Sequence, residues 1–259
     1  MKEAQVFHRL GEILRIQGRY VDAFDALTKA QRLFIEAGDV LGVAQCLRRL
    51  GDILWMQSKH TEASNILMEA RRQFLEIGNV LGATQCLQSL GIILSMEDKC
   101  IEATSTLMDA QRQFLEISDA QGVAQCLQCL GNILGTQSKY AEATATLMQA
   151  QTQFLEIGGT LGMAQCSQSL GNILHLQYKY TEATDTLTQA QRQFLNIGDV
   201  LGVAQCSQSL GDILYMQHKY IEATDTLSHA HSLFLEISNV SGAAKCLETL
   251  EQIPAIMGP

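Results

Sequence analysis

The chain has 259 residues, of which 47% are hydrophobic, so it has ample material for a buried core. Its net charge is −9, and residues 81–259 carry most of the excess, with 17 acidic against 7 basic side chains. Proteins that bind nucleic acid are usually basic, so this balance argues against nucleic acid as the main ligand. No apolar run is long enough to span a membrane, and the first residues lack the apolar centre of a signal peptide.

A motif of the form Leu-Gly-x-Ile-Leu recurs every forty residues, at Leu10, Leu50, Leu90, Leu130, Leu170 and Leu210. So strict a period indicates an array of equal units in which each unit packs only on its neighbours. We therefore expect one continuous domain over residues 1–259, without an internal boundary. Its repeats are predicted near 4–40, 44–80, 84–120, 124–160, 164–200 and 204–240, followed by a terminal helix at 242–253.

Each unit predicts two helices. In the second unit, apolar residues from Val43 to Leu54 are spaced by four, three and four, which places them on one face of a helix. The same kind of spacing from Ala63 to Ile77 predicts a second and longer helix, after a short polar connection. Short connections favour antiparallel neighbours. First helices are expected near 4–17, 43–57, 83–97, 123–137, 163–177 and 203–217, and second helices near 20–37, 60–77, 100–117, 140–157, 180–197 and 220–237.

Helix ends are marked in the sequence as well. Gly78 is a plausible stop for a second helix, and Asn79 can cap the first helix that follows. Gly159 stands at the equivalent cap position of another repeat, where we expect a weaker helix start. Pro254 is expected to stop the terminal helix, because proline lacks the amide hydrogen that a helix interior needs.

The recurring glycine needs a compensating contact, because glycine inside a helix costs about 1 kcal/mol relative to alanine. Small residues recur in the second helix, at Ala63 and Ala70 and their equivalents. We interpret Gly51 as the point where two helix backbones approach closely. Replacement of Gly51 by leucine is therefore predicted to lower the melting temperature through overpacking.

Six of the eight cysteines share one repeat position, at Cys46, Cys86, Cys126, Cys166, Cys206 and Cys246. Equivalent positions in stacked units lie about 10 Å apart, too far for a disulfide, so we expect small buried apolar residues there. Unpaired thiols suit a reducing compartment and hence a cytoplasmic location. The Cys126-x-x-Cys129 pair has no second pair at zinc spacing, so we expect neither a metal nor another cofactor. No catalytic triad or carboxylate pair is recognisable, so we expect no enzyme.

The pattern Leu47-x-x-Leu50-Gly51-x-x-Leu54, followed by Ala63-x-x-x-Leu67-x-x-Ala70, resembles the tetratricopeptide repeat (TPR) and recurs along nearly the whole chain. The unit is forty residues long instead of the usual 34 and lacks the proline that ends the second helix. It is similar in this respect to the TPRs of kinesin light chains, of polarity scaffolds that bind G-protein regulators, and of fungal STAND NTPases. No phosphate-binding loop is present in this chain.

This resemblance implies an all-α fold, a right-handed α-solenoid of six helix pairs with one further helix. It also implies that the first helices line a concave groove that binds a protein partner. One known TPR groove clamps the C-terminal carboxylate of chaperones with basic residues and asparagines. The matching places hold Glu12, which has the wrong sign, and few donors, so chaperone tails are not expected as ligands; those places are His8, Glu12, Arg49, Gln85 and Ser89.

Four positions of each first helix face inward by helical phase. The first position is glutamine at Gln5, Gln45, Gln85, Gln125, Gln165 and Gln205. The second holds His8, Arg48, Gln88, Gln128, Gln168 and Gln208. The third holds Glu12, Asp52, Ile92, Asn132, Asn172 and Asp212, and the fourth holds Arg15, Trp55, Ser95, Gly135, His175 and Tyr215.

These positions predict how a ligand binds. A side-chain amide both donates and accepts hydrogen bonds, as the backbone of an extended peptide requires. Arginines gather at the N-terminal end beside Trp55, which favours an acidic or phosphorylated residue there with an apolar anchor; they are Arg9, Arg15, Arg48 and Arg49. The hypothesis is an extended peptide with its acidic end toward repeats 1 and 2. A simple duplication of one unit would also produce the glutamines.

Two other functions stay open. Near-identical repeats can stack end to end between molecules, and the apolar residues Ile253, Ile256 and Met257 close to the C-terminus favour such a homo-oligomer. The chain can also be the ligand-sensing tail of a STAND-type signalling NTPase, as the family resemblance implies.

Overall fold

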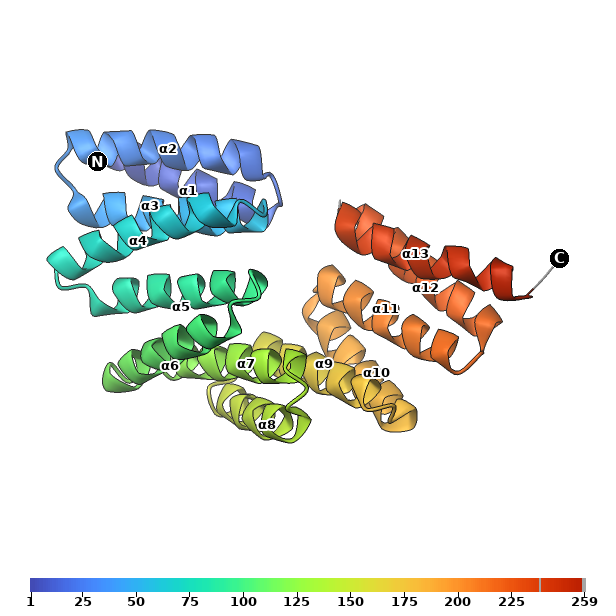
Figure 1. Cartoon of the computed structure of the whole chain (residues 1–259). Helices are drawn as coiled ribbons and strands as arrows, with labels where there is room; N and C mark the ends of the chain where they lie inside the picture. The colour runs from blue at the N-terminus through green and yellow to red at the C-terminus, as the bar shows by residue number, and fades with distance from the viewer. Residues whose placement is uncertain (238, 258–259) are drawn as a thin grey trace. The chain divides into compact units, whose positions relative to one another are not determined.

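The computed structural model describes residues 1–237 and 239–257, with side chains up to residue 253. The described part is all α-helical, and consecutive helices form antiparallel pairs joined by short turns (Figure 1). Contacts divide the chain into two compact units, Met1–Ile133 and Leu134–Pro259, and each is described by itself. These pairs are the sequential repeats of a TPR solenoid, as the sequence predicts.

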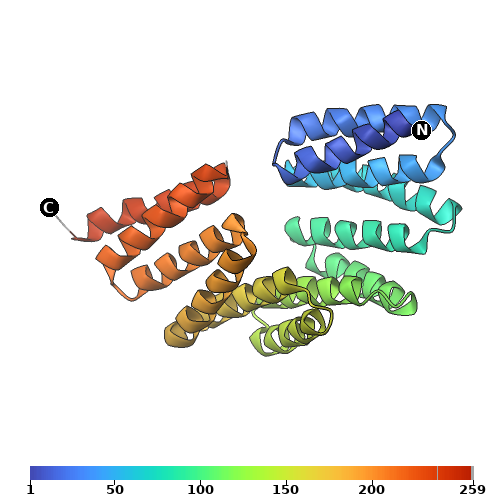
Figure 2. The same cartoon turned by 180° about the vertical axis from the view of Figure 1, so that it is seen from behind.

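The first unit contains three complete helix pairs and most of a further first helix. Its helices are α1 (Lys2–Ile16), α2 (Tyr20–Glu36), α3 (Val40–Met56), α4 (His60–Glu76), α5 (Val80–Met96), α6 (Cys100–Glu116) and α7 (Ala120–Thr136), the last of which continues past the unit boundary. Within each pair the two helices pack on each other, and α2 and α4 also contact the first helices that follow them, α3 and α5. The turned view in Figure 2 shows the same pairing.

The second unit repeats this arrangement. Its helices after the end of α7 are α8 (Tyr140–Glu156), α9 (Thr160–Leu176), α10 (Tyr180–Ile197), α11 (Val200–Met216), α12 (Tyr220–Glu236) and α13 (Val240–Met257). α9 packs on α10, α11 packs on α12, and α13 closes this series against α12 (Figure 1).

The first helices begin about three residues earlier than predicted, at Val40 where residue 43 was expected. The cause is the N-cap: Asp39 Oδ1 accepts a hydrogen bond from the amide of Gly42 at 3.0 Å. This bond caps α3 at Asp39, so the helix begins at the next residue, Val40. The prediction that second helices are longer is consequently wrong, since α3 and α4 both have 17 residues. Gly159 makes no side-chain cap bond, as expected, yet α9 begins at the usual place.

The predicted end of the last helix is also wrong. Pro254 does not stop α13, which runs from Val240 to Met257. Proline has a helical φ of its own, so one proline near a helix end removes a single backbone hydrogen bond without forcing the helix to stop. The side chains of Ile256 and Met257, on which the end-to-end stacking hypothesis partly depends, lie outside the described residues.

The core confirms that two helices approach closely at Gly51 but shows a different residue opposite the glycine. Ala63, Leu67 and Ala70 are fully buried, as are the six cysteines that share a repeat position. A Cβ atom on Gly51 would lie 2.6 Å from Leu67 Cγ, so the side chain opposite the glycine is a leucine, and the alanines only bring the backbone near. A second glycine, Gly42, is equally restricted, since a Cβ there would lie 2.5 Å from the ring of Phe34.

Candidate binding surface on the first helices

Some of the residues predicted to face inward on α1 and α3 border a cavity in the first unit. Its volume is about 260 Å³. Three of its lining residues are predicted inward-facing residues, Gln5, His8 and Gln45, and Arg9 belongs to the predicted arginine cluster. The other four come from the end of α2 and the start of α3: Phe34, Asp39, Leu41 and Gly42. Arg9 and Gln45 are exposed, so their polar groups are open to a ligand.

His8 is a half-buried side chain in the wall of this cavity. Burial lowers its pKa below the usual 6.5, with Glu12 opposing that change and Arg49 and Arg48 adding to it. The imidazole is therefore neutral at pH 7. Its Nε2 atom is buried and has no hydrogen-bond partner within the described part of the chain. An unpaired buried nitrogen is costly, so this atom is poised for a ligand group.

Arg15, Arg48 and Arg49 of the predicted arginine cluster lie near carboxylates that the sequence analysis did not consider as their partners. Arg49 Nε lies 3.0 Å from Glu12 Oε1, and Arg49 Nη1 lies 3.4 Å from Asp52 Oδ2. Arg15 Nη2 lies 3.5 Å from the other oxygen of Glu12. Arg15 and Arg49 are thus parts of an internal ion-pair network that joins α1 to α3, and neither is a freely available charge.

Arg48 differs from its neighbours. It is half-buried, and its Nε atom is a buried donor without a partner among the described residues. Burial and the charge of Arg49 lower its pKa, yet a guanidinium keeps its proton in proteins. Burial raises the pKa of Asp52, and the positive charges of Arg48 and Arg49 oppose that rise. Arg48 therefore forms no ion pair within the described residues, unlike Arg15 and Arg49.

The amide ladder is partly bonded to itself. In the first unit Gln88 Nε2 donates to Gln125 Oε1 at 3.2 Å, and in the second unit Gln168 Nε2 donates to Gln205 Oε1 at the same distance. Each bond uses only part of the hydrogen-bonding capacity of a primary amide. Gln85, Gln128 and Gln165 of the predicted wall are half-buried.

Several non-repeating residues of the predicted site contact their own unit. Trp55 is half-buried against the hydrophobic core of the first unit, so its ring is not wholly available as an anchor. Tyr215 packs on the core of the second unit and donates its hydroxyl to Gln252 Oε1 at 3.2 Å. His175 is half-buried beside Tyr180, with ring centroids 6.0 Å apart, and burial lowers its pKa.

The polar residues at the third inward position also differ between repeats. Asn132 is exposed, whereas Asn172 and Asp212 are half-buried. Asp212 accepts a hydrogen bond from Thr249 Oγ1 at 3.3 Å, and Asp52 accepts one from Ser89 Oγ at 3.4 Å. The sequence analysis did not identify these contacts, although both join residues that are 37 positions apart and lie on successive first helices.

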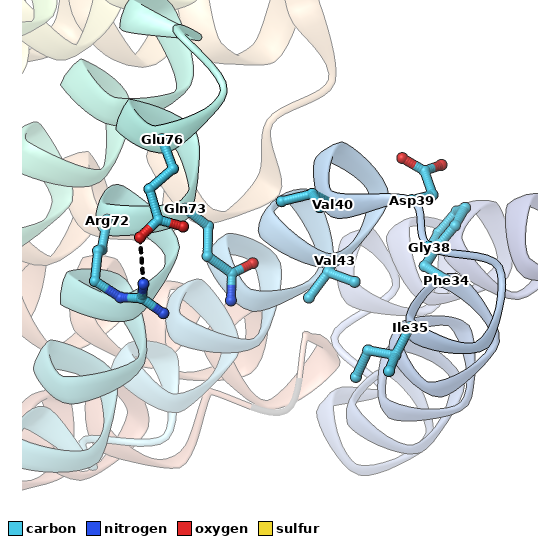
Figure 3. A pocket seen from close by; sticks show the side chains of 9 residues that line it. All are labelled: Phe34, Ile35, Gly38, Asp39, Val40, Val43, Arg72, Gln73 and Glu76. Atoms are coloured by element: carbon cyan, nitrogen blue, oxygen red, sulfur yellow. Dashed lines mark hydrogen bonds and ion pairs between the residues drawn. The ribbon is translucent and has the colours of Figure 1, made fainter.

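A separate cavity lies at the corner where α2, α3 and α4 meet, and its volume is about 270 Å³. Figure 3 shows Ile35, Val40 and Val43 on one side and the Arg72–Glu76 ion pair with Gln73 on the other. Gln73 Nε2 donates to Glu69, while Gln73 Oε1 is buried and lacks a partner in the described residues. None of the predicted inward-facing residues lines this second cavity.

The thiols of the Cys-x-x-Cys pair have environments that suppress reactivity. Burial raises the pKa of Cys126 to about 12 and that of Cys129 to about 11, so both are protonated at neutral pH and are weak nucleophiles. Among the described side chains, no group of three or more His, Cys, Asp or Glu residues is placed to hold a metal ion. No helix within this part of the chain has the length and apolarity needed to cross a membrane.

Comparison with known proteins supports the repeat assignment. Residues 2–76 match the model of a family described as tetratricopeptide repeat. No curated protein sequence matches the chain. A solved structure of the Rap conjugation gene regulator of the plasmid pLS20, in complex with the Phr* peptide, aligns with a TM-score of 0.71 and 15% identity, over 95% of this chain and 73% of that chain.

Two further solved structures have the same fold. The STAND protein PH0952 from Pyrococcus horikoshii, with a tetratricopeptide repeat sensor, aligns with a TM-score of 0.66 and 11% identity over 96% of this chain but only 42% of that chain. Nearly identical TPR-like repeats of a Podosopora anserina putative kinesin light chain align with a TM-score of 0.54 and 11% identity, over 74% of this chain and 95% of that chain. At these identities the likeness concerns the fold alone.

Proposed function

We propose, from the premise that this chain is a tetratricopeptide repeat protein, that the first helices of residues 1–133 bind an extended peptide with its acidic end at repeats 1 and 2. The observation that carries the proposal is a set of three buried nitrogens without hydrogen-bond partners within the described residues of the wall: His8 Nε2, Arg15 Nε and Arg48 Nε. A buried polar group left without a hydrogen bond costs about 1–3 kcal/mol. A ligand acceptor at this place offsets that cost.

The charge of the site selects the ligand. Arg48 is only partly compensated and Arg9 is exposed beside the cavity, so the acceptor that fits is a carboxylate or a phosphate. Neutral His8 contributes a hydrogen bond without adding charge. Because Arg49 is held by Glu12 and Asp52, it positions the wall and is not assigned to the ligand.

The rest of the peptide lies along the amides of α3, α5 and α7. Gln45 is exposed and Gln85 half-buried, and Gln88 and Gln125 already bridge two repeats. Because an amide matches both N–H and C=O groups, this wall binds peptide backbone with little dependence on side-chain identity. A peptide complex of the structurally similar Rap regulator is compatible with this role.

Fluorescence anisotropy with two labelled peptides tests the proposal. One begins with glutamates and the other has glutamines in their place. Arg48→Gln introduces the residue that repeats 3 to 6 carry at this position, and we expect about tenfold weaker binding of the acidic peptide. Arg32→Gln removes the same charge from an exposed position of α2 and should leave affinity within about twofold. Equal affinities for both peptides would contradict the charge assignment.

Self-association is the second candidate function, and exposed apolar residues favour it. Ile35, Leu75 and Leu115 occupy one repeat position near the ends of second helices and are 59%, 50% and 59% exposed. A protein that presents such residues repeatedly has surface to bury in an assembly. Light scattering over a concentration series distinguishes the two functions, because a peptide-binding monomer keeps a constant mass whereas an assembling array does not.

The sensor-tail alternative follows from the structural likeness to the STAND protein, in which the matched region is less than half of that chain. It predicts that the natural gene product includes an NTPase domain. Mass spectrometry of the endogenous protein checks this, because a product of the size of the present chain excludes a covalently attached NTPase.

A further inference from the structure

The second unit contains a cavity of about 490 Å³ that the proposed function does not use. It lies between α10, α11 and α12, which are neighbours in the chain and in space (Figure 1). Its lining comes from all three helices: Thr184, Thr188 and Gln191, then Ser207, Leu210 and Leu214, then Asp225, Thr226 and His229. By helical phase, the α11 residues in this lining lie on the side of the helix away from Gln205 and Asp212 of the inward wall.

Small residues at two repeat positions open this cavity. Thr188 occupies the position of a methionine in repeats 2 to 4, including Met148. Ser207 occupies the position of a leucine in repeats 2 to 4, including Leu127. Both replacements shorten a side chain and introduce a hydroxyl. At these two positions the sequence differs from repeats 2 to 4 by residues that are smaller and more polar. The resulting cavity is large enough to hold a side chain of a ligand.

The lining combines an apolar floor with one negative charge. Leu210 and Leu214 supply the floor, and Thr184 and Thr188 supply hydroxyls that make no hydrogen bond within the described residues. Asp225 is exposed and forms no ion pair in the part of the chain that the structure describes. The unit as a whole, residues 134–259, has 11 acidic and 5 basic side chains. A ligand for this cavity needs an aliphatic body and a cationic end.

We propose that this cavity binds the side chain of an arginine presented by a partner protein. The methylene stem of arginine lies along Leu210 and Leu214, and its guanidinium reaches the carboxylate of Asp225. A guanidinium presents several N–H donors in a plane, so it can bond both oxygens of a carboxylate and a neighbouring threonine hydroxyl. The acidic charge of the unit attracts such a partner over longer range. The site is independent of the peptide wall of residues 1–133.

The repeats provide matched variants for a test. Thr188→Met refills the cavity with the residue of repeats 2 to 4, and Asp225→Asn places there the residue that repeat 2 carries as Asn65. Asp185→Asn is the control, because Asp185 is the equivalent residue forty positions earlier and does not line the cavity. It removes the same charge from the same unit. Circular dichroism melting establishes that each variant is folded.

The probes are the blocked tripeptides acetyl-Ala-Arg-Ala-amide and acetyl-Ala-citrulline-Ala-amide, which differ in charge but hardly in shape. NMR titration of the whole chain should show saturable amide shifts in α10, α11 and α12 with the arginine peptide, and binding about fivefold weaker with citrulline. Asp225→Asn should weaken binding of the arginine peptide about fivefold, and Thr188→Met should abolish the amide shifts. Asp185→Asn should change the affinity for this peptide less than twofold.

Three results would overturn the assignment. The first is equal binding of arginine and citrulline peptides, which removes the role of charge. The second is an equal loss of affinity for the arginine peptide in Asp225→Asn and Asp185→Asn, which would mean that only the net charge of the unit matters. The third is the absence of saturable shifts in these helices at millimolar peptide while the wild-type chain is folded. Each can occur with peptide binding at Arg48 intact, so the two proposals fail separately.

Discussion

Gln88 on α5 donates a hydrogen bond to Gln125 on α7 at 3.2 Å, and this bond links the first helices of successive repeats. The two residues are 37 positions apart, one helical turn short of the repeat length. The same separation recurs in the other links between first helices: Glu12 with Arg49, Asp52 with Ser89, Gln168 with Gln205, Asp212 with Thr249 and Tyr215 with Gln252. Within each unit, polar contacts therefore join the first helices of successive repeats along the predicted inward wall.

This connection predicts energetic coupling between repeats. In a double-mutant cycle with Gln88→Ala and Gln125→Ala, we expect a coupling of about 0.5–1.5 kcal/mol in the free energy of unfolding, the net value of one hydrogen bond. Gln45→Ala combined with Gln125→Ala serves as the control, because these two make no hydrogen bond to each other in the described structure and should be additive. Urea denaturation measures both cycles, and strict additivity in the first would contradict the link.

The unpaired oxygen of Gln73 predicts a stabilising substitution. In the next repeat Thr84 Oγ1 donates to Gln113 Oε1 at 2.9 Å, whereas the equivalent of Thr84 opposite Gln73 is Ala44. Ala44→Thr should supply the missing donor and raise the free energy of unfolding by about 1 kcal/mol.

Ala204→Thr is the matched control for that substitution. The residue at the corresponding position opposite Ala204 is Leu233, which cannot accept a hydrogen bond. A hydroxyl there finds only a backbone carbonyl of its own helix, as Thr84 Oγ1 also does with Val80 O, and threonine has a lower helix propensity than alanine, so the second unit should lose stability. Thermal melting of both variants decides the matter: a loss of stability in Ala44→Thr equal to that in Ala204→Thr would contradict the proposed role of the Gln73 oxygen.

The close packing of Gly51 predicts opposite effects for two glycine-to-alanine changes. Gly51→Ala places Cβ 2.6 Å from Leu67 Cγ, so we expect a destabilisation of about 1–3 kcal/mol. Gly135 is also inside a helix, but the new methyl group there would lie 3.5 Å from Ile173 Cδ1, an ordinary van der Waals contact. Gly135→Ala should instead stabilise by about 0.5–1 kcal/mol through helix propensity. Equal effects in chemical denaturation would be incompatible with the packing described.

Asp212 predicts a pH-dependent term in stability. Burial raises its pKa above the ordinary 3.8, and the hydrogen bond from Thr249 only partly opposes this. The folded state thus holds this proton more tightly than the unfolded state, so the contribution of Asp212 is fully present below pH 3.8 and is lost as pH rises through the raised pKa.

Asp212→Asn removes this term and introduces the residue of repeats 4 and 5, Asn132 and Asn172. The stability of the variant relative to wild type should therefore increase from pH 4 upward and level off above the folded-state pKa. Denaturation at a series of pH values measures the difference. A difference that stays constant with pH, or that falls as pH rises, would show that the carboxylate is not destabilised by burial.

Periodicity was sufficient to predict most of the fold. The forty-residue spacing and the steps of three and four from Val43 to Leu54 identified the helix pairs, because a buried stripe repeats with the helix period. The same reasoning placed Cys46 and its equivalents in the core. It failed at the start of first helices, where the cap at Asp39 adds a turn whose apolar residues Val40 and Leu41 are exposed and lie outside the buried stripe. It also failed at Pro254, where a single lost hydrogen bond does not end a helix.

The site was harder to predict than the fold. Helical phase placed His8 and Gln45 among the inward-facing positions, and both line one cavity, but the sequence analysis treated every arginine as available. The pairing of Arg49 with Glu12 depends on how two helices are placed relative to each other and on side-chain rotamers, and neither follows from one helix considered alone. The repeat offset of 37 positions is the signal that would have revealed these pairs. The unpartnered nitrogen of Arg48 is visible only once its surroundings are known.

The most direct test of the central claim is hydrogen–deuterium exchange of the whole chain with and without the acidic peptide. A bound ligand slows exchange where it suppresses local opening. Our account predicts slower exchange in α1, α3 and α5, strongest around His8 and Arg48, and loss of this protection in Arg48→Gln. Protection confined to the second helices α2, α4 and α6, or equal protection in wild type and Arg48→Gln, would contradict it.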